Sequence, residues 1–418
     1  MDISKNLTSE IAKVVQNNKE EYINLLKDLI ALDTTHDKER VGQDLIISRL
    51  KNLPCEIDTF EVNTDKLLQY NEYNEGYQYK DRPNVVATFK GRGRGKSLIL
   101  NGHMDTVFPS TPENWKFNPW NPQIVDGKLY GLGSCDMKAG LLALLFSMEV
   151  LHELEVPLLG DVIFQSVVDE EASGGNGTLA CVDRGYRADG VLVAEPTELK
   201  PMAAHIGSVA FKLTFSGKAS HSNLKWEGIN SIEKSLPLLN ALRELESKWQ
   251  KEQSHSLLPK PILSINRIDA GTGPIILPST SVIEGNFTYL PGWGQVINEF
   301  QDVIEEVTNQ DGWLRENKPQ LEWIHHVRPY SSDPKGQWPQ TVEKSIENYL
   351  DSGTKIEGFP TGADARILAN VGEMSTIILG PGSIRQAHTV NEFVEIEEYL
   401  QSISLLSYII TNWTNTRV

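Results

Sequence analysis

The chain has 418 residues, of which 39 are Lys or Arg and 56 are Asp or Glu, for a formal charge of −17. This length predicts two or three domains, and the acidic excess argues against nucleic acid or an anionic membrane as the main partner. No segment approaches the roughly 20 consecutive apolar residues that cross a bilayer, so no membrane partner is expected.

Two features of the chain indicate a cytoplasmic protein. The first ten residues (MDISKNLTSE) lack the apolar core of a secretion signal. Cys55, Cys135 and Cys181 are scattered and odd in number, so a disulfide framework is not predicted.

Residues 1–205 alternate helical and strand patterns. Apolar periodicity predicts helices at 19–32 and 137–153 and strands at 84–90, 97–101, 162–168 and 191–194. Such alternation predicts an α/β domain with a mostly parallel sheet and helices on both faces. The polar, tyrosine-rich segment 61–83 is expected to form an exposed loop.

Acidic and histidine side chains follow the ends of these strands. The residues at or just beyond such ends are His103, Asp105, Glu170, Glu171 and Glu195, with Asp136 between two of the elements and His388 after an apolar run at 376–379. Ligands bind outside the carboxyl ends of strands in open α/β sheets, so a shared site is expected. Two imidazoles and several carboxylates suit zinc and, less tightly, cobalt or manganese, and they would repel one another without metal. The sequence therefore predicts a two-metal hydrolase site.

Between residues 206 and 326 the pattern changes to strand, helix, strand, strand, helix, strand. This βαββαβ order predicts a ferredoxin-like α+β domain. Glu195 and His388 lie on either side of it and are expected to share one site, so the segment is interpreted as an insertion. The first domain then comprises 1–205 and 327–418 and closes with a helix at 395–412.

Seven ordered motifs resemble the co-catalytic zinc aminoacylase/carboxypeptidase family, which includes acetylornithine deacetylase and succinyl-diaminopimelate desuccinylase. They are NGHMDTV (101–107), GLGSCDMKAG (131–140), DEEASGGNG (169–177), AEPT (194–197), GKASHSN (217–223), TGADARIL (361–368) and GPGSIRQAHTVNEFV (380–394). The resemblance covers nearly the whole chain and implies two divalent ions, most simply zinc.

The resemblance also implies a role for each site residue. His103 and Glu195 would bind the first ion, Glu171 and His388 the second, and Asp136 both. In the same comparison, Asp105 would orient the imidazole of His103, and Glu170 would be the general base that takes a proton from water and returns it to the leaving amine.

The inserted domain would act as lid and dimerisation domain. His221 in GKASHSN resembles the family histidine that reaches into the partner subunit's active site and stabilises an oxyanion, so a homodimer is expected. Where much of the family has an Asn and an Arg that bind the substrate carboxylate, this chain has Ile275 and Thr288. An α-carboxylate on the substrate is therefore not implied. Arg267, Arg328, Arg366 and Arg385 are possible replacements.

The leading functional hypothesis is a di-zinc amidohydrolase of the acetylornithine deacetylase type, which removes a short acyl group from a small N-acyl amine or amino acid. Three alternatives stay open: an N-formylaminopyrimidine deformylase, a dipeptidase or carboxypeptidase, and a catalytically silent dimeric binding protein. The complete set of ligands and the presence of Glu170 argue against the last.

Overall fold

The computed structural model describes residues 3–416, which form two compact units. The first comprises the described chain up to Ala204, the segment Ser331–Phe359 and the described chain from Ala363. The second comprises His205–Tyr330 and Pro360–Gly362, so it interrupts the first. No helix in residues 3–416 has the length and apolar character needed to cross a membrane.

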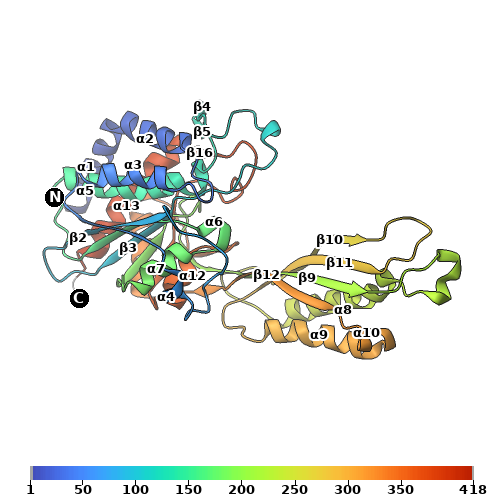
Figure 1. Cartoon of the computed structure of the whole chain (residues 1–418). Helices are drawn as coiled ribbons and strands as arrows, with labels where there is room; N and C mark the ends of the chain where they lie inside the picture. Colours follow the sequence, from blue (N-terminus) through green and yellow to red (C-terminus); the bar gives the residue numbers. More distant parts are fainter. Residues whose placement is uncertain (1–2, 417–418) are drawn as a thin grey trace. The chain divides into compact units, whose positions relative to one another are not determined.

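A nine-stranded sheet forms the centre of the first unit (Figure 1). Its central strands β6, β3, β7 and β15 are parallel, and the strands beside them pair antiparallel. The strands are β1 (Glu56–Glu61), β2 (Pro83–Phe89), β3 (Leu98–His103), β6 (Val162–Val167), β7 (Gly190–Val193), β8 (Met202–His205), β13 (Tyr330–Ser331), β14 (Glu357–Phe359) and β15 (Thr376–Ile378). A separate small sheet contains β4 (Gln123–Val125), β5 (Lys128–Tyr130) and β16 (Phe393–Glu395). The predicted α/β fold is confirmed, with parallel pairing confined to the centre.

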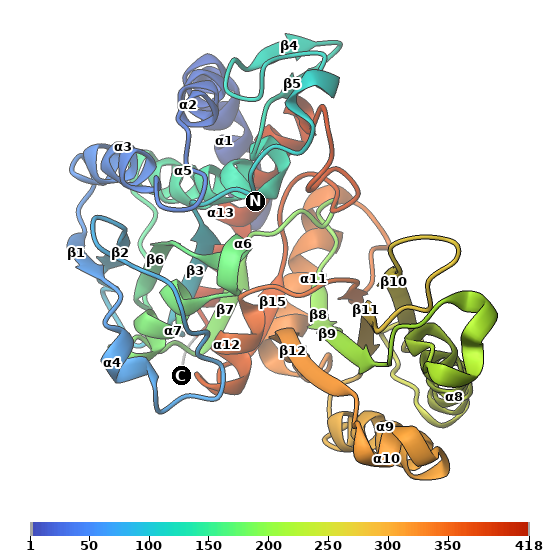
Figure 2. The same cartoon turned by 45° about the vertical axis from the view of Figure 1, so that its right-hand side comes forward.

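Helices cover both faces of this sheet (Figures 1 and 2). One face carries α3 (Arg40–Leu50), α5 (Ala139–Glu153) and α13 (Ile396–Thr414), and the other carries α7 (Asn176–Asp183) and α12 (Ala365–Asn370). The remaining helices of this unit are α1 (Ile3–Asn17), α2 (Lys19–Ala31), α4 (Thr64–Leu67), α6 (Glu170–Ser173) and α11 (Gln337–Leu350). Helix α5 packs against α13 and is buried around almost its whole circumference, which explains why its sequence is apolar on every side.

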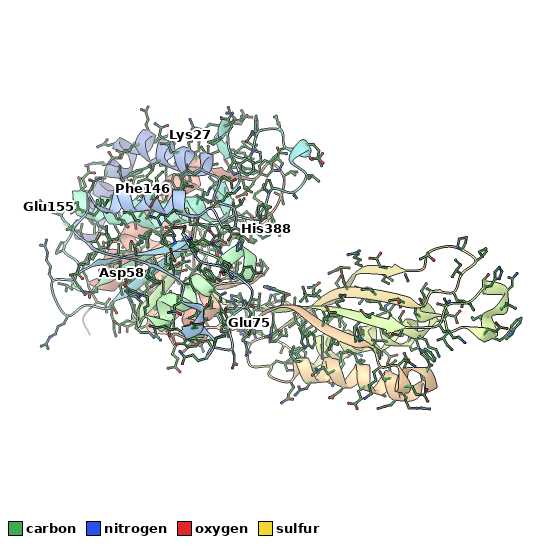
Figure 3. All side chains as sticks on the ribbon, in the orientation of Figure 1. Lys27, Asp58, Glu75, Phe146, Glu155 and His388 are labelled. Atoms are coloured by element: carbon green, nitrogen blue, oxygen red, sulfur yellow. The ribbon has the colours of Figure 1, made fainter. Side chains whose placement is uncertain are left out.

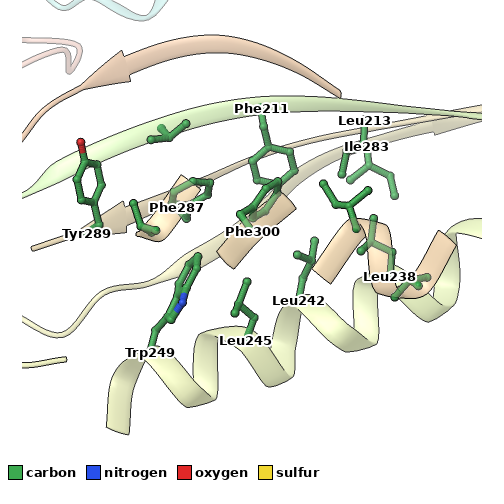
Figure 4. Packing of buried hydrophobic residues seen from close by; sticks show 14 of the residues in the cluster. Phe211, Leu213, Leu238, Leu242, Leu245, Trp249, Ile283, Phe287, Tyr289 and Phe300 are labelled. Carbon is green, nitrogen blue, oxygen red and sulfur yellow. The ribbon is translucent and has the colours of Figure 1, made fainter. Parts of the chain in front are cut away.

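The second unit is a four-stranded antiparallel sheet in the order β10, β11, β9, β12. Its elements are β9 (Gly207–Ser216), α8 (Ser231–Glu252), β10 (Leu263–Ala270), β11 (Thr280–Tyr289), α9 (Val296–Gln310), α10 (Gly312–Glu316) and β12 (Gln320–Val327). Alternating residues of β9 and β11 are buried, so one face of the sheet packs on the helices around Phe211, Phe287 and Trp249 (Figure 4). The predicted βαββαβ arrangement is thereby confirmed.

The segment 61–83 differs from the expected exposed loop. Most of its residues are exposed or half-buried, but it contains the short helix α4, and Tyr79 and Arg82 are 4% and 1% exposed. The polar groups of these two residues contact the buried carboxylates of Asp169 and Glu39. The prediction of exposure therefore fails for these two residues.

Candidate metal centre

Five metal-ligand candidates converge at the carboxyl ends of the central parallel strands in the first unit. His103 ends β3, Glu171 follows β6 at the start of α6, Glu195 follows β7, and Asp136 lies in the irregular turn before α5. His388, which is labelled in Figure 3, lies in the loop after β15. Parallel pairing of β3, β6, β7 and β15 is what brings these distant positions to one edge.

The five side chains form two groups that share Asp136. His103, Asp136 and Glu195 form one, and Asp136, Glu171 and His388 form the other; within each, the ligand atoms lie within 4.8 Å of one another. Oδ1 of Asp136 is 3.2 Å from Nε2 of His103, and its Oδ2 is 3.6 Å from Nε2 of His388. The two oxygens of one carboxylate therefore face different histidines, the arrangement that a bridging ligand requires.

The charges of these side chains fit divalent cations. Burial raises the pKa of Glu195 well above its usual range, and the negative charge of Asp136 raises it further. Burial also raises the pKa of Glu171, whose hydrogen bond raises the pKa of His388 to about 9. Within residues 3–416, the two histidines are the only cationic side chains that form ion pairs with these carboxylates. Such crowded carboxylates with imidazole neighbours suit zinc.

Glu170 belongs to neither group of ligands. Burial raises the pKa of its carboxyl well above the usual range, and the charges of Asp364, Glu171 and Asp136 act in the same direction. A carboxyl group with these neighbours and no place among the ligands is a candidate for proton transfer.

Asp105 fixes the segment that carries this carboxyl group. The backbone N–H groups of Glu170 and Glu171 donate to its two carboxylate oxygens at 3.2 and 2.9 Å. Nδ1 of His103 lies 2.9 Å from the backbone oxygen of Asp105 and 3.7 Å from its carboxylate. The group that accepts a hydrogen bond from Nδ1 of His103 is therefore the backbone carbonyl of Asp105 and not its carboxylate. The carboxylate binds the N–H groups of Glu170 and Glu171 instead.

Glu392 supports Asp136 and was not singled out from the sequence. Its buried carboxylate accepts backbone N–H groups from Gly133, Cys135 and Asp136 at 2.9, 2.8 and 3.0 Å. Burial raises its pKa to about 8. The only sequence signal was its place in the motif HTVNEFV, four residues after His388. It holds the turn that presents the shared ligand.

His221 belongs to the second unit and to neither ligand group. Its exposed ring accepts the N–H of Asn223 at Nδ1, 3.2 Å away, which leaves Nε2 as the donor of the neutral ring. Ile276, in the connection between β10 and β11, forms a β-bridge with His221.

The two positions without the usual carboxylate-binding residues also lie in the second unit. Oγ1 of Thr288 accepts the N–H of Ile262 at 2.9 Å, and Ile275 is exposed in the connection between β10 and β11. Among the arginines considered as replacements, Arg366 is buried and donates to the carbonyl of Gly174, while Arg267 pairs with Asp269.

A small apolar pocket adjoins the second ligand group. It has a volume of about 130 Å³ and is lined by Phe108, Trp115, Leu132 and His388, among others. No Lys, Arg, Asp or Glu side chain is among the described residues that line it. Apart from His388, the described lining of the pocket therefore carries no charge.

The fold and the two groups of candidate metal ligands are those of a metal-dependent hydrolase. The profile of peptidase family M20/M25/M40 matches residues 99–412, so the chain belongs to this family. It is accordingly a hydrolase that acts on amide bonds.

Similar proteins differ in the substrates for which they are named. An N-formyl-4-amino-5-aminomethyl-2-methylpyrimidine deformylase of Halalkalibacterium halodurans is 31% identical over 98% of both chains. A probable succinyl-diaminopimelate desuccinylase of Staphylococcus aureus is 28% identical over 93% of this chain and 96% of the relative. The solved structure of a dipeptidase from Saccharomyces cerevisiae matches 98% of this chain and 99% of its own with a TM-score of 0.75, but at 13% identity this likeness concerns the fold alone.

Proposed function

We propose that this hydrolase removes a short acyl group from a small N-acyl amine and uses two divalent cations, zinc best and cobalt or manganese as alternatives. The observation that carries the proposal is the shared carboxylate of Asp136, with one histidine opposite each of its oxygens. His103 and Glu195 would complete one ion site, and Glu171 and His388 the other. Bound there, the ions supply an electrophile for the amide carbonyl and lower the pKa of a water molecule.

Glu170 is the proposed general base. It takes the proton of the water whose oxygen attacks the carbonyl carbon, and it returns that proton to the amine nitrogen as the C–N bond breaks. Its burial and its carboxylate neighbours raise its pKa, which is the direction needed for a group that both accepts and donates near neutral pH. The Nε2–H of His221, supplied by a partner subunit, would stabilise the oxyanion of the tetrahedral intermediate.

Among acyl amines, an N-formylaminopyrimidine is favoured over N-acetylornithine, the substrate type that the sequence motifs favour. Three observations support this choice. Thr288 and Ile275 offer no cation to a carboxylate, the pocket that His388 helps to line is otherwise free of charged side chains among its described residues, and a relative 31% identical over 98% of both chains is named for this substrate.

The test is a hydrolysis panel with zinc-loaded protein. It contains the N-formylaminopyrimidine, N-acetylornithine, N-acetylputrescine, succinyl-diaminopimelate and a dipeptide. We expect the formyl compound to have the highest kcat/KM, and a chelator to abolish and zinc to restore its hydrolysis. N-acetylornithine should exceed its decarboxylated analogue N-acetylputrescine by less than about a thousandfold, because a buried cation that needs a carboxylate would give a larger ratio. A larger ratio would reveal a carboxylate receptor, and undiminished hydrolysis after chelation would rule out the metal centre.

A two-fold symmetric homodimer through the second unit completes the proposal. The edge strand β10 is largely exposed, and beside it lies a groove of about 590 Å³ that includes Leu236, Leu263 and Ile268. An unpaired strand edge next to apolar side chains is suited to pair with the same edge of a second copy.

A further inference from the structure

Segment 61–83 forms a hydrogen bond with Asp169, the residue that precedes the proposed base Glu170. The hydroxyl of Tyr79 donates to Oδ2 of Asp169 at 2.5 Å and accepts from Nδ2 of Asn176 at 2.6 Å. Asn176 also binds the backbone of the segment, since it accepts the N–H of Asn74 and donates to its carbonyl. These contacts tie the segment to both ends of the loop that carries Glu170 and Glu171.

Asp169 is fully buried, and two basic side chains lie near its other oxygen. Arg82 and His36 lie 3.5 and 3.7 Å from its Oδ1, and Arg82 is engaged more closely by Glu39, at 2.5 Å. The hydroxyl of Tyr79 thus donates a short hydrogen bond to a carboxylate that is shielded from water. A buried carboxylate that loses such a donor is costly to keep in place.

The backbone of Asp169 makes its anchoring important for Glu170. Asp169 has φ 71° and ψ 31°, a left-handed conformation that few residues other than glycine adopt. The turn is closed by the N–H of Gly175 on the carbonyl of Asp169 and the N–H of Gly174 on the carbonyl of Glu170, both at 2.9 Å. If Asp169 relaxed to a common conformation, the peptide plane that leads into Glu170 would rotate.

We infer that Tyr79 is a positioning residue for catalysis: through Asp169 it holds the backbone that aims the carboxylate of Glu170. Segment 61–83 thereby holds the base loop, residues 169–176, through Asp169 and Asn176. Asp105 binds the same loop through the backbone N–H groups of Glu170 and Glu171. This inference rests on the proposed role of Glu170.

The substitution Tyr79→Phe tests the positioning role of Tyr79, because it removes only the hydroxyl group. We expect kcat to fall about ten- to a hundredfold, the effect of a misplaced catalytic group, with KM changed by less than about threefold and zinc content unchanged. Tyr70→Phe is the matched control: Tyr70 lies in the same segment and donates to Asp183 at 3.0 Å, away from the base loop. Equal losses of kcat in both variants would overturn the inference.

The Glu170→Gln background separates positioning from general damage. There, Tyr79→Phe should lower the residual kcat no further, because the group that it positions is already gone. A further loss by the same factor as in the native background would show that Tyr79 acts elsewhere. If Glu170→Gln itself left kcat intact, the proposed base would be wrong whatever Tyr79 did.

Asp169→Ala removes the acceptor of the same hydrogen bond and serves if Tyr79→Phe does not fold. It should lower kcat at least as much as Tyr79→Phe, and the double variant should be no worse than Asp169→Ala alone. Full kcat in Asp169→Ala would contradict the inference.

Discussion

Glu170 and Glu171 are adjacent, yet the structure gives their side chains different neighbours. Glu171 reaches the ion pair with His388 at 2.8 Å, whereas Glu170 joins neither ligand group. Both residues lie in the first turn of α6, which Asp105 holds through their two backbone N–H groups. Neighbouring residues of a helical turn point in different directions.

Exchange of each acid for its amide tests this division. Glu170→Gln keeps the shape but cannot accept a proton, so kcat should fall at least about a hundredfold with both ions retained. Glu171→Gln should instead lose one ion. Metal analysis beside steady-state kinetics checks both. Loss of an ion from the Glu170 variant alone would mean that the two roles are reversed.

The site residues at strand ends could be predicted because each follows an apolar run that is recognisable by itself. Glu392 could not be predicted in this way, because its role depends on backbone N–H groups 256 to 259 positions away in the sequence. The sequence spacing predicts that Asp105 orients His103, but it does not tell whether the carboxylate or the backbone carbonyl of Asp105 accepts the hydrogen bond. In the structure the carbonyl lies closer to Nδ1 of His103.

At the scale of elements, the turn Ser134–Lys138 depends on one carboxylate. At pH 9, above the pKa of about 8, Glu392 is mainly a carboxylate. Glu392→Gln would then replace an oxygen by an amino group that faces backbone N–H donors, so the metal-free protein should lose about 1–3 kcal/mol of unfolding free energy. Glu395→Gln is the control, because Glu395 forms a part-exposed ion pair with Lys128 and should cost less than about 1 kcal/mol. Urea unfolding measures both. Equal losses would show that the three N–H contacts add nothing.

The two edges of the second sheet allow a matched test of assembly. Ile268 on β10 is 53% exposed and Ile324 on β12 is 57% exposed. Burial at the proposed interface would remove water from the charge of a lysine, so Ile268→Lys should convert the proposed dimer to monomer, while Ile324→Lys should leave it intact. Light scattering during size-exclusion chromatography gives the masses. The reverse outcome would place the interface along β12.

Elements were predictable where their periodicity was strong, as in α2, α5 and the six main elements of the second unit. The burial of Tyr79 and Arg82 in segment 61–83 was not predictable, because it depends on their partners Asp169 and Glu39. Local composition predicts the burial of apolar side chains. It does not predict the burial of a polar side chain whose hydrogen-bond partner is distant in the sequence.

At the scale of the whole molecule, the proposed dimer predicts that two inactive variants restore each other. A His221→Ala chain lacks the oxyanion donor, and a Glu170→Gln chain lacks the base. If His221 acts on the partner's site, a mixed dimer contains one site with both residues intact. Mixing the variants should therefore regain up to about half of the native activity per mixed dimer. No recovery despite demonstrated subunit exchange would place His221 in its own chain's site or outside catalysis.

The interruption of the first unit by the second bears on how the protein is synthesised. His205–Tyr330 is nearly all of the second unit and contains its entire core, whereas β15, His388 and α13 are translated later. Until α13 emerges, α5 lacks the helix that packs against it, and the second ligand group lacks His388. Domains fold as units during translation, so we expect the inserted unit to fold before the first unit, which requires β15, His388 and α13. Binding of the proposed second ion would then come after the folding of the inserted unit.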